Sequence, residues 1–420
     1  MIIPNRRTDG SQSELPPSHV MMLMLTQTLG WGTSISLIGV LAAHIRADLD
    51  LSSAAVFGGT TVMFLTGAFL APIAGRLADR VGGLRVLCYG TPVLAAALLV
   101  LSTASGPNAY YAAWVLFGFG MHFGLGTATY NGIAQVAGKS AYRAIGLLTL
   151  ATGMCSTIFW PLSEALLGLM DWRQLCLLYA AATMVIAWPI HIWLAKRHNP
   201  SREHATQDES RASPAHVSPE LAGRAFALLM IMQVLTAALT TGMAILAIDI
   251  FVALGTSRAE AVFAGSLIGL AYLVSRGGDT LLGSRLPRIR LARFVHAALP
   301  LSLLPLLVCA VLALPVPGWL AAVAAVCYGL PAGLLGILRP VLPYHIFGSF
   351  NYGLRLGRLG RPTDLANAVV PAAFAWGMSR SAEAVLWFGF GMAAIAFVAL
   401  MMLSRMISQG KAHRHYNSTA

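Results

Sequence analysis

The 420-residue sequence has very little charge: Asp, Glu, Lys and Arg together make up 10% of it, whereas hydrophobic residues make up 57%. Soluble domains carry roughly 25% charged residues, so a soluble chain of this composition would have too little polar surface to face water. The mean hydropathy of +0.70 points the same way. We therefore expect lipid to be the solvent for most of the surface.

The sequence also lacks the motifs of several enzyme classes. It contains no Gly-rich phosphate loop, no His-Glu-x-x-His and no Gly-x-Ser-x-Gly, so no ATP-driven pump is predicted. Its five cysteines show no close pairing and fall in or beside apolar runs. They are interpreted as small hydrophobic residues, which predict neither a disulfide framework nor a zinc site. We expect no enzyme, no cofactor and no metal.

Apolar runs of about 20 residues recur along nearly the whole chain, and each is long enough to cross a ~30 Å hydrocarbon layer. A polar stretch, Lys196–Gly223, divides them into two sets of six and cannot pack a core. The predicted spans are 19–44, 53–74, 86–105, 109–136, 144–169, 173–195, 224–252, 259–283, 293–315, 318–339, 363–379 and 382–405.

The prediction is an all-α integral membrane protein with twelve transmembrane helices in two bundles. Its expected parts are an N-terminal tail (1–18), a six-helix bundle (19–195), a linker (196–223), a second six-helix bundle (224–405) and a C-terminal tail (406–420).

Basic residues are distributed very unevenly over this topology. The side that holds the N-terminus receives 22 of the 28 Lys and Arg residues, and the opposite side receives four. Such a bias predicts an inner-membrane protein with both termini and the linker in the cytoplasm. The net charge of +12 is spread over every loop on that side. It is therefore interpreted as a topology signal in a lipid bilayer, and no nucleic-acid partner is expected.

The loop after the second span reads Gly75-Arg76-Leu77-Ala78-Asp79-Arg80-Val81-Gly82. Glycines permit a tight reversal, Asp79 can accept hydrogen bonds from a helix N-terminus, and Arg80 can pair with a carboxylate or phosphate. This order, at this place in a chain of two six-helix halves, resembles the signature of the major facilitator superfamily. The resemblance implies two bundles that rock about a midplane site. It also implies a conformational latch made by Gly75, Asp79, Arg80 and Gly82, although a basic turn with a capping Asp would explain the same residues.

Three further features look like the bacterial monocarboxylate and oxalate/formate carriers of that superfamily: Gly30-Trp31-Gly32-Thr33, Asp171-Trp172-Arg173 and a basic residue late in the eighth span. One departure is that the eleventh span has Asp364 and Asn367 but no lysine, so the second cation for a dicarboxylate is missing there.

This finer resemblance implies a monomeric secondary transporter that moves a small organic anion, a monocarboxylate, in symport with protons. Efflux of a drug or toxic anion is the alternative, and a non-transporting membrane sensor is a third reading.

Charged side chains within spans are costly unless paired or hydrated, so each is a candidate functional residue. Arg276 lies roughly 26 Å from the outer start of its helix and is the predicted substrate anchor. Asp279, three positions on, could be its counter-ion or a proton acceptor, or the two could form a structural pair. Arg339, followed by Pro340, is expected to snorkel at the cytoplasmic boundary. Asp364 is expected in the first turn of the eleventh span.

His122 lies roughly 20 Å into the fourth span and is a candidate for substrate binding and for carrying a proton. A hydrogen-bonded interior histidine is the other interpretation. Trp31 could form one wall of the cavity or part of the core. Tyr272, one turn before Arg276, and Gln233 in the seventh span are further cavity candidates, which ordinary interhelical hydrogen bonding would also explain.

Overall fold

The computed structural model describes residues 15–137, 140–198, 219–281 and 287–419, of which residues 219–220 and 409–419 are described by their backbone alone. Regular structure within these ranges is entirely helical. The predicted tails and linker (1–18, 196–223 and 406–420) lie largely outside the described side chains, and their boundaries stay predictions.

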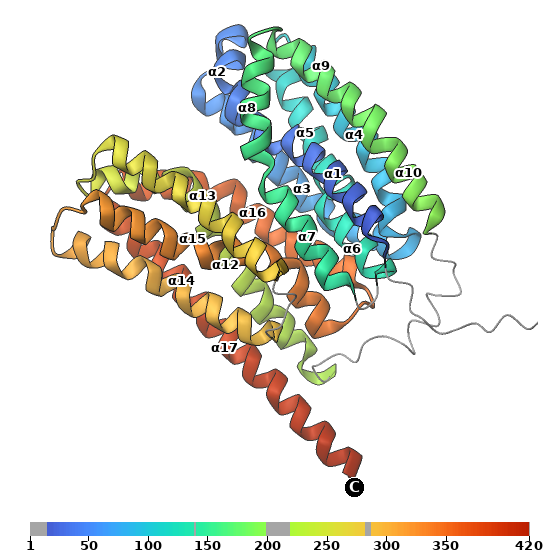
Figure 1. The fold of residues 1–420 in the computed structure, drawn as a ribbon, viewed down its shortest axis with the longest axis vertical. Helices are drawn as coiled ribbons and strands as arrows, with labels where there is room; N and C mark the ends of the chain where they lie inside the picture. The colour runs from blue at the N-terminus through green and yellow to red at the C-terminus, as the bar shows by residue number, and fades with distance from the viewer. Residues whose placement is uncertain (1–14, 138–139, 199–218, 282–286, 420) are drawn as a thin grey trace, which may run out of the picture.

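Two helix bundles make up the described chain, and Figure 1 shows the first in blue to green and the second in yellow-green to red. The first contains α1 (Pro17–Gly32), η1 (Ile35–Leu37), α2 (Ile38–Leu49), α3 (Ser53–Val81), α4 (Gly83–Ser102), α5 (Pro107–Phe123), α6 (Gly126–Val136), α7 (Ala141–Gly153), α8 (Cys155–Leu167), α9 (Trp172–Ala182), η3 (Thr183–Ala187) and α10 (Trp188–Arg197). The second contains α12 (Pro219–Ala253), α13 (Arg258–Leu281), α14 (Arg288–Val311), α15 (Gly318–Phe347), α16 (Tyr352–Met378) and α17 (Ala382–Thr419).

Nine of the described helical segments are long and apolar enough to cross a membrane, and α1 with η1 and α2 forms a tenth that is bent by 42°. The other two predicted spans are helical as well. One is interrupted between α5 and α6, and the other, α16, carries several charged residues in its first half. The predicted all-α architecture is therefore confirmed, with helices at all twelve predicted places.

Hydrogen bonds stabilise the two broken spans. At the bend after α1, the hydroxyl of Ser34 donates to the carbonyl oxygen of Gly30 over 2.6 Å. At the break between α5 and α6, the amide of Gln27 donates to the carbonyl oxygen of Gly124 over 3.1 Å. Polar side chains from the same or a neighbouring helix thus satisfy backbone groups that a break would otherwise leave unpaired in lipid.

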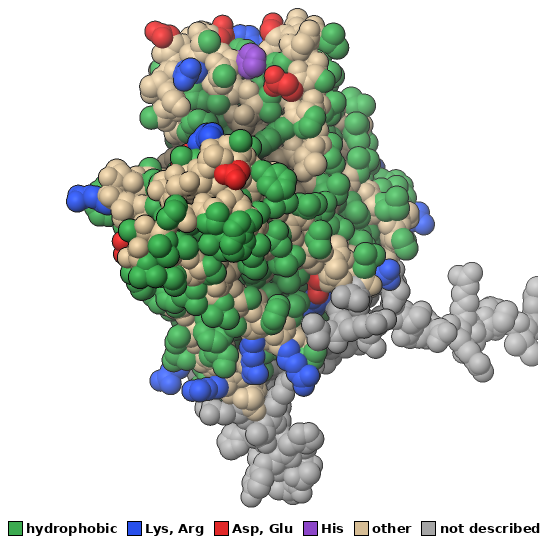
Figure 2. Space-filling view, turned by 60° about the vertical axis from the view of Figure 1, so that its left-hand side comes forward, with side chains coloured by type: hydrophobic (Ala, Val, Ile, Leu, Met, Phe, Trp, Pro, Cys, Tyr) green, Lys and Arg blue, Asp and Glu red, His purple; other side chains and the backbone are tan. Residues whose placement is uncertain are grey.

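The two ends of the molecule differ in charge. We call the basic end the one at which α3 and α10 end and α16 begins; Arg76, Arg80, Lys196 and Arg197 are exposed there. Figure 2 shows Lys and Arg gathered along the lower edge of the molecule, below a broad hydrophobic face. A hydrophobic face above a charged edge fits a protein whose sides face lipid.

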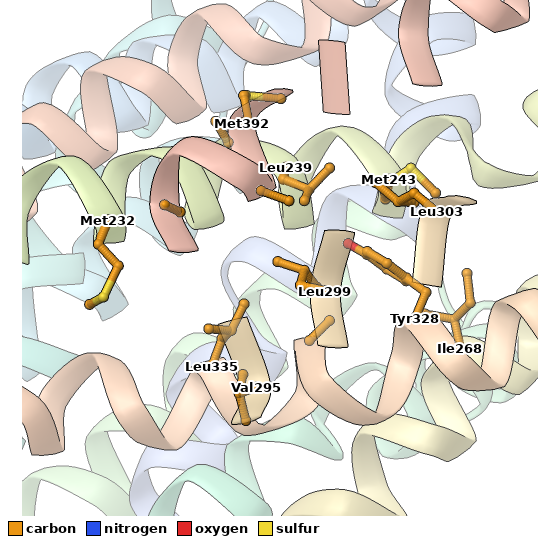
Figure 3. Close-up of a cluster of buried hydrophobic side chains, with 14 of the residues drawn as sticks. Met232, Leu239, Met243, Ile268, Val295, Leu299, Leu303, Tyr328, Leu335 and Met392 are labelled. Carbon is orange, nitrogen blue, oxygen red and sulfur yellow. The ribbon is translucent and has the colours of Figure 1, made fainter. Parts of the chain in front are cut away.

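The interior of the second bundle is packed with large apolar side chains (Figure 3). Leu239 of α12, Leu299 and Leu303 of α14 and Leu335 of α15 are at most 2% exposed. This core holds α12, α14 and α15 together and fixes the helix that carries Arg339.

The bundles meet along α3 and α16, where glycine allows the backbones to touch. A Cβ atom on Gly75 would lie 2.1 Å from the carbonyl oxygen of Gly353, and one on Gly357 would lie 2.2 Å from that of Ala71. Neither position has room for a side chain, so α3 and α16 pack as closely as small residues permit.

Several hydrogen bonds join the bundles, and they lie in the half of the molecule nearest the basic end. They join Asp79 to Gly353 and Leu354, His122 to Asp364, Tyr142 to His345, and Arg276 to Thr149. Towards the opposite end the bundles diverge (Figure 1). The structure therefore represents a state in which the basic end is closed.

Candidate functional site

Arg276 of α13 bridges the two bundles. Its Nε donates to the carbonyl oxygen of Gly333 in α15 over 2.9 Å, and a terminal nitrogen donates to that of Thr149 in α7 over 3.0 Å. The side chain is half-buried, and it forms none of the ion pairs found among the described residues. It is thus an uncompensated positive charge between the bundles, where the sequence predicted a substrate anchor.

Two glycines make room for this guanidinium. A Cβ atom on Gly153 of α7 would lie 2.3 Å from a terminal nitrogen of Arg276, and one on Gly336 of α15 would lie 2.5 Å from the other. A side chain at either position would displace the guanidinium. The placement of Arg276 therefore depends on glycine in both bundles.

Arg339 of α15 lies inside the membrane-spanning part, and the expectation that it snorkels at a boundary is wrong. The helix does not end at Pro340; it continues to Phe347, about 12 Å further. A terminal nitrogen of Arg339 donates to the Thr240 hydroxyl over 2.8 Å, while Nε is buried and has no hydrogen-bond partner in the described chain. Arg339 is a second uncompensated cation, which the sequence did not single out for the site.

Gln233 supports this second arginine. It is 6% exposed, and its amide donates to the backbone carbonyl oxygen of Arg339 over 2.9 Å. The structure thus shows Gln233 in an interhelical hydrogen bond, the other interpretation open from the sequence. A substrate-binding role for it stays a prediction.

Two tyrosines lie near the arginines, and a tryptophan lies close to one of these tyrosines. The ring centre of Tyr272 lies 5.9 Å from the guanidinium carbon of Arg276. Trp31 and Tyr130 both lie against Gly126. Tyr130 is also close enough to Arg276 and Arg339 to interact electrostatically with both. Each of the three rings is half-buried. Trp31 and Tyr272 were predicted for the cavity, whereas Tyr130 was missed because it follows the break between α5 and α6.

His122 of α5 and Asp364 of α16 form a buried pair between the bundles. The distance from Nε2 to Oδ2 is 2.7 Å, and both side chains are at most 10% exposed. Nδ1 of His122 lies 3.1 Å from the hydroxyl of Thr127. The expectation that Asp364 occupies a first helical turn is wrong, because α16 begins twelve residues earlier at Tyr352. A histidine and a carboxylate in hydrogen-bond contact can exchange or share a proton.

Asp279 does not pair with Arg276, and that part of the sequence prediction is wrong. Both of its oxygens lie 2.9 Å from a terminal nitrogen of Arg288, at the start of α14. Both helix termini are at the basic end, which brings this partner closer than Arg276. A role for Asp279 in proton coupling remains untested.

Asp79 joins the bundles at the basic end. Its Oδ1 accepts hydrogen bonds from the backbone N–H of Gly353 and the amide of Asn131, and its Oδ2 accepts one from the N–H of Leu354. Since Gly353 and Leu354 open α16, the expected contact with a helix N-terminus is present. Gly82 ends α3 with φ of +97°, a left-handed conformation that favours glycine. Arg80 is exposed, and the latch role of the four residues stays a prediction.

The chain is similar in sequence to known transporters. The sequence profile of the Major Facilitator Superfamily matches residues 21–360. The uncharacterized transporter YycB of Bacillus subtilis is 28% identical over 175 residues, which cover 39% of this chain and 40% of YycB. The match therefore spans less than half the length of that relative.

Solved structures share the fold. FucP in an outward conformation has a TM-score of 0.68 at 13% identity and covers 91% of this chain and 98% of its own. The proton:xylose symporter XylE has a TM-score of 0.68 at 16% identity, and the match covers 91% of this chain and 95% of XylE. The human organic anion transporter MFSD10 has a TM-score of 0.64 at 17% identity, and the match covers 92% of this chain and 100% of MFSD10. At these identities the similarity shows the fold alone.

Proposed function

The chain belongs to the Major Facilitator Superfamily, and on that basis we propose that it is a secondary transporter that moves a small organic anion in symport with protons. The observation that carries this proposal is the pair of half-buried guanidinium groups, Arg276 and Arg339, which have no carboxylate partner among the described residues. An uncompensated charge at this depth is costly, and a bound anion would offset that cost.

A carboxylate is the anionic group that suits these arginines best. A guanidinium offers it two parallel charge-assisted hydrogen bonds, and the rings of Trp31, Tyr130 and Tyr272 provide an apolar surround for a short carbon chain. The sequence resemblance favours a monocarboxylate. How many acidic groups the anion carries depends on the part played by Arg339.

Proton coupling is assigned to His122 and Asp364. The pair joins α5 of one bundle to α16 of the other, so the bundles cannot separate between these helices without breaking it. Protonation of Asp364 would remove the negative charge that strengthens this bond and would favour opening. Anion and proton then bias the same equilibrium between two states. One fold relative is described as a proton:xylose symporter, which is consistent with this coupling, and another is described as an organic anion transporter, which is consistent with an anionic substrate.

Sidedness follows from the charge distribution. Under the positive-inside rule the basic end faces the cytoplasm of an inner membrane, with both termini on that side. The closed basic end then corresponds to an outward-facing state. The protein, working as a monomer, would release substrate into the cytoplasm after the hydrogen bonds of Asp79 and of the His122–Asp364 pair break.

Uptake into proteoliposomes tests the function. The purified protein is reconstituted and given radiolabelled carboxylates, with D-xylose as a neutral control, under an inside-alkaline pH gradient. We expect at least one carboxylate to accumulate, and a protonophore to abolish the accumulation. Accumulation of xylose but of no carboxylate would refute the organic-anion proposal. Carboxylate movement that ignores the gradient would refute the proton coupling.

A further inference from the structure

The guanidinium groups of Arg276, from α13, and Arg339, from α15, lie close together beside α15. The guanidinium carbon of Arg276 is 2.9 Å from where a Cβ atom of Gly336 would be. Arg339 follows Gly336 by three residues, so it occupies the same helix face at a Cβ distance of about 5–6 Å from that point. Arg276 is accordingly one of the groups whose charge acts on Arg339.

No described carboxylate neutralises either group. The ion pairs of the described chain join His122 to Asp364, Arg173 to Asp48, Arg258 to Asp249, and Arg288 to Asp279. Within the described part of the chain, Arg276 and Arg339 donate to backbone carbonyl oxygens and a threonine hydroxyl, which carry no full charge. A single negative charge would neutralise one arginine and leave the other in a region of low dielectric constant.

We infer that the transported anion carries two acidic groups, one held by Arg276 and the other by Arg339, so that a dicarboxylate binds better than the monocarboxylate of the same length. The inference rests on the organic-anion transport proposed above. Arg339 of α15 would then serve as the second cation, which the eleventh predicted span lacks.

Each arginine keeps donors for its own acidic group. Arg276 uses Nε and one terminal nitrogen in its two backbone contacts, and N–H groups remain on the other. Arg339 uses one terminal nitrogen for Thr240, and its Nε is unpaired. The buried hydroxyl of Tyr328 interacts with that of Tyr272, and both side chains lie near Arg339. The Nε of Arg339 is thus a buried donor without a partner in the described chain, and a second acidic group would satisfy it.

Equilibrium binding to the full-length purified protein tests the inference. Dissociation constants are measured at pH 7 for unbranched dicarboxylates of two to six carbons and for monocarboxylates of the same lengths. We expect the best dicarboxylate to bind roughly 10- to 100-fold more tightly than its monocarboxylate, the range for one extra charged hydrogen-bond contact. Arg339→Gln should reduce this ratio to near one, because it removes the group that holds the second acid and so weakens dicarboxylate binding far more than monocarboxylate binding. Arg276→Gln should weaken both.

Two controls separate a binding role from a structural one. Arg293→Gln removes an arginine that also donates to a hydroxyl, that of Ser404, but that lies at the basic end of α14; it should keep the parent's ratio. Arg339→Lys keeps the charge and should retain part of the dicarboxylate preference.

The outcomes distinguish the two proposals. If the parent binds no carboxylate of either series, the proposed function fails, and this inference fails with it. If the parent binds monocarboxylates through Arg276 and shows no preference for dicarboxylates, or if Arg339→Gln keeps the preference, organic-anion transport stands and the inference is overturned.

Discussion

Replacing Asp79 by asparagine should open the basic end. The carboxylate accepts three hydrogen bonds on two oxygens, two of them from the first turn of α16 at 2.7 and 2.8 Å. Asparagine has one acceptor oxygen, so at least one backbone N–H loses its charged partner. Such a bond contributes about 1.5–3 kcal/mol. A loss of about 2 kcal/mol would lower the ratio of closed to open molecules roughly 30-fold, at a factor of ten per 1.4 kcal/mol.

Cysteine labelling measures this shift. Ala71 of α3 is fully buried and lies against Gly357 and Gly360 of α16, so Ala71→Cys, in a background without native cysteines, reports opening of the basic end. Asp79→Asn should raise its labelling by a membrane-impermeant maleimide applied from that side. Asp171→Asn is the matched control: Asp171 caps α9 within one bundle through a single oxygen, which asparagine retains. Unchanged labelling in Asp79→Asn, or an equal rise in the control, would refute the latch.

Three other predictions concern the site and the topology. Gly153→Ala places a Cβ against the Arg276 guanidinium and should weaken anion binding by at least tenfold, whereas Gly269→Ala, with open space around it, should not; equal binding constants would contradict this. His122→Gln should leave anion exchange intact but abolish accumulation driven by a pH gradient, and gradient-driven uptake at the parental level would remove His122 from the coupling. A fusion of alkaline phosphatase at Ser210 should be inactive because the linker is cytoplasmic, and activity would overturn the topology.

The fold was predictable because composition and the length of apolar runs depend on the bilayer and not on tertiary detail. The errors came from helix ends. The predicted spans 318–339 and 363–379 stop just before Pro340 and start just after Pro362, but α15 contains three internal prolines and α16 contains two. Membrane helices tolerate proline where neighbouring groups satisfy the freed carbonyls. Arg339 and Asp364 were therefore placed too close to the surface.

A single sequence does not show which charged side chains of the site pair with one another. His122 and Asp364 are 242 residues apart, and they meet only because α3 packs against both α5 and α16. The same holds for Asp279, whose spacing from Arg276 suggested a pair on one helix face although Arg288 is its partner. Depth along a helix was enough to single out Arg276, because it requires only the helical rise.

Binding of the transported carboxylate to Arg276 variants tests the central claim most directly. We predict that Arg276→Lys, which keeps the charge but loses the planar fork, weakens binding, and that Arg276→Ala weakens it about 100-fold or more, as expected for the loss of two charge-assisted bonds. Arg173→Ala, which removes another arginine bonded to two backbone carbonyl oxygens but at the opposite end, should bind like the parent. If Arg276→Ala elutes as a folded monomer and binds and transports the anion as well as the parent does, Arg276 is structural and the organic-anion account is wrong.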